Sequence, residues 1–182
     1  MAHPAKQMKL NSLSKEERLC NFTLKKLLFE QGNQFQEYPF RIFWKTIDPN
    51  LEKIFFAGSP YFFNGLDKLQ NPIQKLQNPS FPQRKIPANA YFLQPAKCLT
   101  GVPAKQHKSA VKRNRIRRLV KEAYRNNKQE LYTFLNEKNC FCILGIIYTA
   151  KPVLSYPDIE AKIIVSLQKL FQKISQQPES CD

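Results

Sequence analysis

The segment from Lys105 to Lys128 constrains this chain more than any other, because it joins dense positive charge to a helical repeat of apolar residues. It carries ten cationic side chains and a single acidic one, so it holds +9 of the whole chain's net charge of +15. On a helical wheel of about 100° per residue, four apolar residues share one narrow arc: Ile116, Leu119, Val120 and Ala123. The pattern predicts a surface helix whose apolar stripe packs on a core.

The polar residues of this predicted helix occupy the opposite arc: Asn114, Arg117, Arg118, Lys121 and Arg125, with Arg113 at the border of the stripe. Arginine has a planar fork of donors that pairs with phosphate oxygens at two points, so an arginine-rich face favours a specific anion over diffuse attraction. For Asn114, a solvated helix position is as good an interpretation as a contact with the anion. A cationic face opposite a buried stripe suits docking on RNA or DNA.

The composition of the whole chain restricts its partner and its compartment. An excess of 29 Lys and Arg over 14 Asp and Glu points to a polyanion, with nucleic acid first and an acidic membrane second. The longest apolar run, Cys140–Tyr148, is too short to cross a bilayer. Met1–Asn11 lacks the apolar stretch of a secretory signal. Because no stretch can cross a bilayer, we expect no membrane partner. The five cysteines are scattered without a Cys-x-x-Cys pair, so we also expect no metal site and a cytoplasmic location.

The order of predicted elements is α-β-β-β-α-β-α, which gives a small α/β fold, an α+β sandwich. A first helix opens near the Ser14–Glu17 capping box or a little later, and Gly32 is its stop. The strands are predicted from alternation of apolar residues, at Asn33–Tyr38, Phe40–Thr46, Cys98–Val102 and Cys140–Thr149. A last helix starts around Ser155–Asp158, which combine a cap with a proline in the first turn.

The chain is predicted to be one domain with extensions. Residues 1–12 form a flexible basic leader, 13–175 a single domain and 176–182 a tail. Within the domain, 48–95 is interpreted as a long, proline-rich and partly disordered insertion between the second and third strands. Its two copies of Lys-Leu-Gln-Asn-Pro are too few for a repeat architecture.

Alternation along the second predicted strand separates its two faces. The residues divide into Phe40, Ile42 and Trp44 on one face, and Arg41, Phe43 and Lys45 on the other. The second face therefore leaves Phe43 between two cations.

The centre of the basic segment resembles the signature of the bacterial ribonuclease P protein subunit. That signature is an alanine, two further residues and Arg-Asn-Arg-aliphatic-basic-Arg, followed by a basic residue and often Glu-Ala. It is met here by Ala110, by Arg113–Arg118 and by Lys121–Ala123. Other segments add to the resemblance, which covers roughly residues 13–47 and 96–175: Leu13–Leu19, Tyr38–Arg41, and Ile143–Tyr148 with the helix after it.

The resemblance implies a ribosomal-protein-S5-domain-2-like α/β sandwich, with a left-handed βαβ crossover that displays the basic helix. Ordinary crossovers are right-handed, so the residues alone would predict the other hand. The loop before the signature departs from the family pattern. Lys105 keeps one of two lysines, whereas Gln106 and His107 replace the second lysine and an apolar residue.

The same resemblance implies the accessory subunit of an endoribonuclease, a hydrolase that removes the 5′ leader of precursor tRNA. The partners would be precursor tRNA and the catalytic RNA, which performs the cleavage with Mg2+, while the protein supplies no catalytic residue. Carried over by position, RNA contacts fall on Arg113, Asn114, Arg117, Arg118 and Lys121, with Arg115 and Lys105 close by and Lys108 and Arg125 extending the cationic segment. Phe29 and Phe43 correspond to aromatic positions of a cleft for the single-stranded leader, although Phe29 equally fits a core.

Two other functions fit the same residues. One is a general RNA- or DNA-binding protein of the ribosomal type, without a role in tRNA processing. The other is a nuclease that uses His107 as a general acid or base. A histidine in a basic loop is more often a surface or RNA-contact residue, and no compact acidic cluster lies beside the basic segment.

Overall fold

The computed structural model of the chain describes residues 13–47 and 86–176, which build a four-stranded sheet in the order β1-β2-β4-β3. The strands are β1 (Asn33–Glu37), β2 (Phe40–Ile47), β3 (Ala96–Gly101) and β4 (Phe141–Tyr148). β2 pairs antiparallel with both β1 and β4, whereas β3 pairs parallel with β4. The parallel pair needs a crossover connection between β3 and β4.

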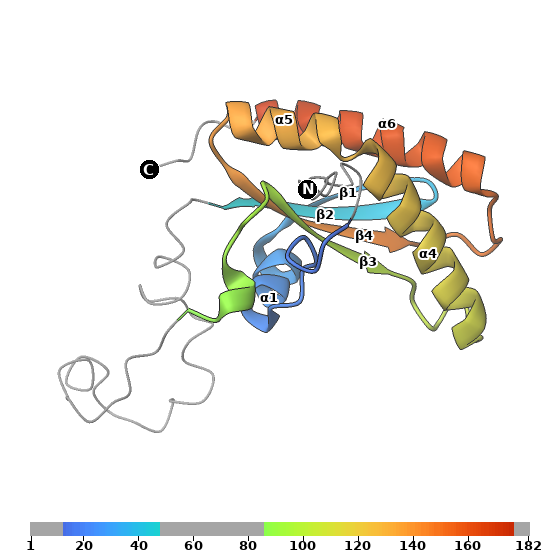
Figure 1. Ribbon diagram of the computed structural model, residues 1–182. Coiled ribbons are helices and arrows are strands. Elements are labelled where there is room, and N and C mark those ends of the chain that lie inside the picture. Colours follow the sequence, from blue (N-terminus) through green and yellow to red (C-terminus); the bar gives the residue numbers. More distant parts are fainter. Residues whose placement is uncertain (1–12, 48–85, 177–182) are drawn as a thin grey trace, which may run out of the picture.

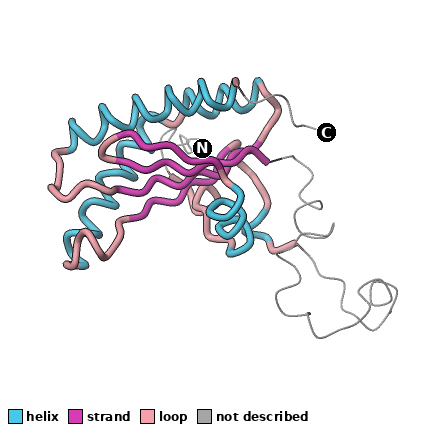
Figure 2. Tube along the Cα trace, turned by 180° about the vertical axis from the view of Figure 1, so that it is seen from behind, coloured by secondary structure: helices cyan, strands magenta, loops and turns pink. Residues whose placement is uncertain are grey.

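The helices of the described ranges cover both faces of the sheet. They are α1 (Phe22–Gln31), the short 3-10 helix η2 (Ala88–Ala90), α4 (Ala110–Asn127), α5 (Gln129–Glu137) and α6 (Tyr156–Ser175). Figure 1 shows α5 and α6 above one face, α4 descending from that layer past the ends of β3 and β4, and α1 below the other face. From behind, the same long helices run along one side of the strands (Figure 2). The fold is therefore an α+β sandwich, as predicted.

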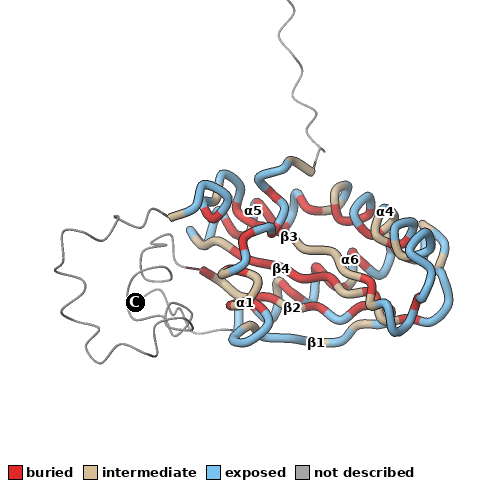
Figure 3. The backbone as a smooth tube through the Cα atoms, turned by 90° about the horizontal axis from the view of Figure 1, so that it is seen from below, coloured by how far each residue is buried: buried red, intermediate tan, exposed pale blue. Residues whose placement is uncertain are grey.

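The sheet separates two hydrophobic cores. The larger core lies under the three long helices and includes Phe40, Ile42 and Trp44 of β2. The smaller core lies under α1 and includes Ile47 and Ile143. Figure 3 shows buried residues along most of β4, whereas along β2 buried residues alternate with more exposed ones. The predicted alternation of β2 is confirmed, since its two faces reach different layers.

The crossover from β3 to β4 runs through α4 and α5. In the view of Figure 1, both strands run from left to right below these helices, and Figure 3 shows that β3 is the strand nearer the viewer of Figure 1. Seen along the strands with the helices on top, β4 thus lies to the left of β3, and the crossover is left-handed. About 98% of such crossovers are right-handed, so the hand expected from the family resemblance is confirmed.

The predicted element order is wrong in one respect, because the crossover contains two helices instead of one. Lys128 ends α4 and begins α5 with a helical backbone, φ −74° and ψ −17°. The chain changes direction there without a glycine or proline, which is why the pattern shows no boundary. The strand limits lie within two residues of those predicted.

The first helix begins later than the Ser14–Glu17 box suggests. The N-cap of α1 is Asn21, whose side-chain Oδ1 accepts a hydrogen bond from Leu24 N at 3.1 Å. At the other end, the stop at Gly32 is confirmed, and Gly32 N donates to Leu28 O at 3.1 Å. A Cβ at Gly32 would stand 2.1 Å from that oxygen, so only glycine fits.

Residues 15–17 form a turn, and residues 17–19 then lie beside the edge strand β3 instead of forming a helix. Leu19 N donates to Cys98 O at 3.0 Å, and Cys98 N donates to Glu17 O at 2.7 Å. These bonds form a parallel bridge between Arg18 and Cys98. They satisfy backbone groups that an edge strand would otherwise expose.

Glu17 is buried at the junction of α4 and α5. Its Oε1 accepts hydrogen bonds from Lys128 Nζ and, at 2.5 Å, from Tyr132 OH. Burial raises the pKa of Glu17, but the bonds from Lys128 and Tyr132 outweigh burial and bring the pKa below its ordinary value. Lys128 belongs to the basic segment by sequence, but in the structure its ammonium group forms this buried ion pair with Glu17.

The predicted insertion lies mostly outside the described residues, as do the leader 1–12 and most of the tail. Its last part, from Ile86 onward, is described and packs on the fold. Ala90 is fully buried, and Ile86 and Phe92 contact the smaller core. Asn21 Nδ2 donates to Asn89 Oδ1 at 3.0 Å, which joins η2 to the start of α1. The end of the predicted insertion is therefore part of the domain.

Candidate nucleic-acid interface

The basic helix exists and is amphipathic, with a buried stripe close to the predicted one. α4 begins at the N-cap Ser109, whose hydroxyl accepts a hydrogen bond from Lys112 N at 3.4 Å. Ile116, Val120, Ala123 and Tyr124 are buried, whereas Leu119 is only half-buried. The helical wheel misses Tyr124 because the predicted stripe contains aliphatic residues only.

The residues predicted to contact RNA lie on the solvent side of α4 and the loop before it. Exposed members are Lys105, Lys108, Asn114, Arg115, Arg118 and Lys121, and half-buried members are Arg113, Arg117 and Arg125. The exposed set combines rigid guanidinium forks with flexible ammonium groups on one helix. Such a surface can contact several phosphates of one nucleic-acid backbone.

Several of these side chains are already oriented by neighbours on α4. Asn114 Oδ1 accepts a hydrogen bond from Arg117 NH1 at 3.1 Å. Arg125 Nε donates to Glu122 Oε2 at 3.0 Å, and this hydrogen bond lowers the pKa of Glu122. Asn114 is therefore not only a solvated helix residue, since it holds one arginine of the signature in place.

Arg113 differs from the other arginines because it contacts the preceding loop. Its NH1 group donates to His107 O at 2.9 Å and to Lys108 O at 2.6 Å. A guanidinium has five N–H donors, so these contacts leave room for an anion. Arg113 thus connects the loop 103–109 to the first turns of α4.

His107 is buried, so the surface position that is common for a histidine in a basic loop is wrong for this residue. Its side chain is 6% exposed, and Nε2 lies 2.9 Å from Ala150 O. The ring also lies 6.0 Å from the ring of Tyr148, measured between centroids. A buried imidazole bonded to a carbonyl is poorly placed to exchange protons with a substrate, so the geometry gives no support to a nuclease centred on His107.

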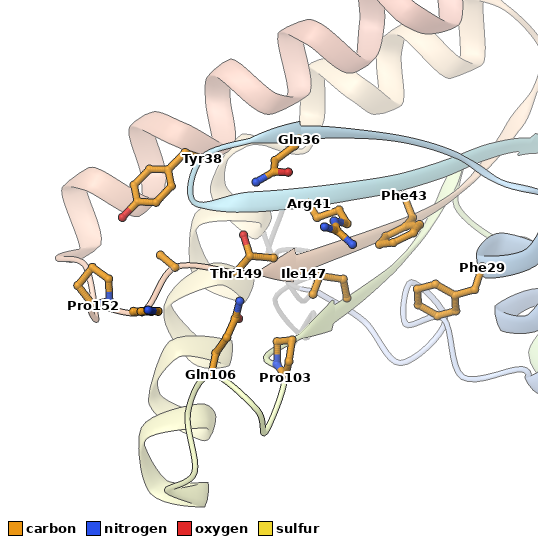
Figure 4. Close-up of a pocket in the computed structure, with 12 residues that line it drawn as sticks. Phe29, Gln36, Tyr38, Arg41, Phe43, Pro103, Gln106, Ile147, Thr149 and Pro152 are labelled. Atoms are coloured by element: carbon orange, nitrogen blue, oxygen red, sulfur yellow. The ribbon is translucent and has the colours of Figure 1, made fainter.

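A cleft of about 780 Å³ opens beside the sheet on the face that carries α1 (Figure 4). The aromatic rings of Phe29 and Phe43 form one end, with centroids 5.1 Å apart in an edge-to-face arrangement. Phe29 is 46% exposed, so the alternative of a plain core position is wrong for this residue. The two aromatic residues predicted for one cleft do lie in the same cleft.

The other end of the cleft is polar and was not predicted. Its lining residues come from the β1–β2 hairpin and from two loops: Gln36, Tyr38, Arg41, Gln106, Thr149 and Lys151. Arg41 could have been found from its place beside Phe43 on the same strand face. The loop residues could not, because their approach depends on the fold of segments far apart in sequence.

Gly145 explains how α1 comes close to the aromatic end of the cleft. A Cβ at this β4 position would lie 3.2 Å from Leu28 Cδ2 and 3.4 Å from Phe43 Cβ. Both distances are at or below ordinary van der Waals contact. The missing side chain therefore lets α1 and Phe43 pack together over the strand.

Across residues 13–47 and 86–176, no three or more His, Cys, Asp and Glu side chains gather as metal ligands would. In the same ranges, no helix has the length and apolar character needed to cross a bilayer.

Comparison with known proteins identifies the family. The family model described as Ribonuclease P matches residues 73–175, more than half of the chain and including all of α4. The chain belongs to the ribonuclease P protein family. Two relatives named Ribonuclease P protein component, from two strains of Porphyromonas gingivalis, are each 33% identical over 72 residues. The match covers 40% of this chain and 53% of each relative, about half of the relatives' length.

Proposed function

We propose that this chain is the protein subunit of ribonuclease P, and that it binds the catalytic RNA and the 5′ leader of precursor tRNA. The observation that carries the proposal is the family match, which includes α4. On this helix, Asn114 and Arg115 of the signature are exposed to solvent. The RNA contacts and the reaction are inferred from the geometry and the resemblance.

In this proposal, α4 contacts the catalytic RNA. Arg115, Arg118 and Lys121 are exposed on the helix, so they can reach phosphates without rearrangement. Arg117, held by Asn114, adds an oriented guanidinium. Arginine can pair with a phosphate at two points, which favours a fixed register over sliding along the backbone.

The cleft is proposed to hold the single-stranded leader. An unpaired base can stack on an exposed ring such as Phe29, and such stacking contributes about 1–3 kcal/mol per base without strong sequence preference. Arg41 and Lys151 at the polar end would neutralise the phosphates of the same strand. The cleft therefore combines aromatic stacking with positive charge, as single-strand binding requires.

The chemistry of cleavage is assigned to the RNA subunit. When bound there, Mg2+ would activate water for hydrolysis at the mature 5′ end of tRNA. The role of the protein is then to capture precursor tRNA and offset repulsion between phosphates, so that less Mg2+ is needed. The cations of α4 and of the cleft are suited to that role.

The decisive experiment is reconstitution of the protein with a ribonuclease P RNA and a precursor tRNA. We expect the protein to accelerate leader removal at low Mg2+ concentration, with little effect at high concentration. A triple variant, Arg115→Ala with Arg118→Ala and Lys121→Ala, should lose the acceleration. Equal binding of unrelated RNA or DNA without acceleration of cleavage would favour a general nucleic-acid-binding protein instead.

A further inference from the structure

The cleft wall opposite the β1–β2 hairpin is built from two loops that meet at His107. One loop, residues 103–109, precedes α4, and the other, residues 149–154, follows β4. The only side chain of the first loop that is buried is His107, whose Nε2 lies 2.9 Å from Ala150 O. A carbonyl oxygen accepts but cannot donate, so Nε2 must carry the proton and donate it.

The first loop is tied to α4 on its other side. Pro103 O accepts hydrogen bonds from the backbone N–H groups of Gln106 and His107, which closes the loop into a tight turn. Arg113 NH1 then donates to His107 O and Lys108 O. His107 therefore touches α4 through its backbone and the β4 end through its side chain.

The second loop is fixed to the sheet. Tyr148 OH donates to Pro152 O at 2.7 Å and accepts from Leu154 N at 3.2 Å. Thr149 donates to Pro39 O through both its backbone N, at 2.8 Å, and its Oγ1, at 3.1 Å. The carbonyl of Ala150 is thus held in place, and the hydrogen bond from His107 reaches a rigid partner.

We infer that His107 is a positioning residue that joins the RNA-binding helix to the leader cleft. Its hydrogen bond sets the distance between Gln106 and Pro103 on one side and the 149–152 loop on the other, and all of these line the cleft. The inference rests on the proposed function, since it presumes that the leader enters this cleft. Losing the bond should relax the wall without changing the exposed face of α4.

The test compares holoenzymes that carry His107→Leu or His107→Gln. Leucine removes the donor, whereas the glutamine amide can donate from nearly the position of Nε2. The measured quantity is the leader contribution, meaning the ratio of affinities for precursor tRNA with a leader and for mature tRNA. We expect H107L to reduce this ratio about 3- to 10-fold, the effect of one hydrogen bond, and H107Q to restore it.

Two further readouts separate positioning from general damage. Affinity for the catalytic RNA alone should stay within about 2-fold of wild type in H107L, because the phosphate contacts of α4 are intact. The control is Ser166→Ala, which removes a buried hydroxyl bonded to Lys162 O in α6, the helix on the face of the sheet opposite α1. This variant changes a buried position of α6 and should keep the full leader contribution.

The inference is overturned if H107L keeps the full leader contribution, if H107Q is no better than H107L, or if Ser166→Ala lowers the ratio equally. Should H107L fail to fold, H107F, which keeps a ring against Tyr148, is judged by the same criteria. A wild-type holoenzyme without any leader contribution would instead count against the proposed function.

Discussion

At the scale of single residues, the cations of the basic segment have different tasks. Lys128 is buried against Glu17, and Arg125 pairs with Glu122. Arg113 donates a hydrogen bond to the loop 103–109 before α4. Arg115, Arg118 and Lys121 extend from the exposed face of α4. The number of cationic residues in the basic segment is therefore larger than the number of exposed cations that can bind a phosphate without rearrangement.

Replacing Arg118 by alanine should weaken binding to the catalytic RNA and flatten its dependence on salt. Removing one cation that binds a phosphate lowers the steepness of log K against log salt concentration by about 0.7–0.9. Filter binding at several salt concentrations measures both quantities. Lys162→Ala, which removes an exposed cation from α6, should leave the slope unchanged. An unaltered slope for Arg118→Ala would place this arginine outside the phosphate contacts.

Residue roles were predictable where they depend on local periodicity. Alternation alone places Phe43 on an accessible face, and the structure agrees. The burial of His107 and of Lys128 was not predictable, because each depends on a partner far away in sequence, Ala150 in one case and Glu17 in the other. A buried polar residue is stable only with such a partner, and a single sequence does not reveal it.

At the scale of elements, the junction of α4 and α5 is held by a buried ion pair with the N-terminal segment. The pKa of Glu17 in the folded protein lies below its ordinary value, 4.5. A carboxylate with a lowered pKa stabilises the fold fully above its unfolded pKa, and this stabilisation is lost as pH falls through the folded pKa. The junction should therefore loosen in acid.

Replacing Glu17 by glutamine should cost about 3–5 kcal/mol at neutral pH, because Lys128 is left buried without its carboxylate. The deficit relative to wild type should shrink as pH falls below 4.5, since the wild-type carboxylate then becomes protonated too. Urea unfolding of both proteins across that pH range measures the difference. A deficit that is constant with pH would contradict the proposed ion pair.

The end of α1 offers a second prediction at this scale. Gly32→Ala should destabilise the protein by about 1–3 kcal/mol, because the new Cβ would meet the backbone oxygen of Leu28. At Gly101, a Cβ would meet only the flexible end of Ile147, at 2.7 Å from Cδ1. Gly101→Ala should cost less, and thermal unfolding of the two variants compares them. Equal costs would mean that the end of α1 can shift to relieve the contact.

Elements were predicted well where each has its own periodicity and clear ends. Strand β2 and helix α6 are examples, since one alternates cleanly and the other has Ser155 as its N-cap. Helix α5 was missed because it follows α4 with only Lys128 between them. The capping box at Ser14 misled for a physical reason: its groups do interact, as Ser14 N donates to Glu17 Oε2 at 2.5 Å, but within a turn.

At the scale of the whole molecule, the sandwich carries two proposed binding surfaces, the exposed side of α4 and the cleft. α5 and α6 lie above the sheet, α4 descends from that layer past the ends of β3 and β4, and the cleft opens on the face that carries α1. The left-handed crossover brings the loop before α4 to the rim of that cleft. The hand could not be derived from periodicity, and the general rule for crossovers favours the opposite hand. It was expected only from the family resemblance.

The long segment between β2 and β3 allows a prediction for the whole fold. The described residues on either side of it, Ile47 and Ile86, both pack in the smaller core. The family match begins at residue 73, beyond that stretch. Deleting residues 50–72 should therefore leave thermal stability unchanged and affinity for the catalytic RNA within about 2-fold of wild type, as circular dichroism and filter binding would measure.

A longer deletion, of residues 50–90, is the matched comparison. It removes the buried Ala90, and it removes Asn89, which bonds Asn21 at the start of α1. We expect this variant to lose stability and, because α1 carries Phe29, to lose leader affinity more than affinity for the catalytic RNA. If the shorter deletion also unfolds the protein, residues 50–72 contribute to the core. If the longer deletion changes neither stability nor leader affinity, the packing of η2 against α1 contributes little to the fold.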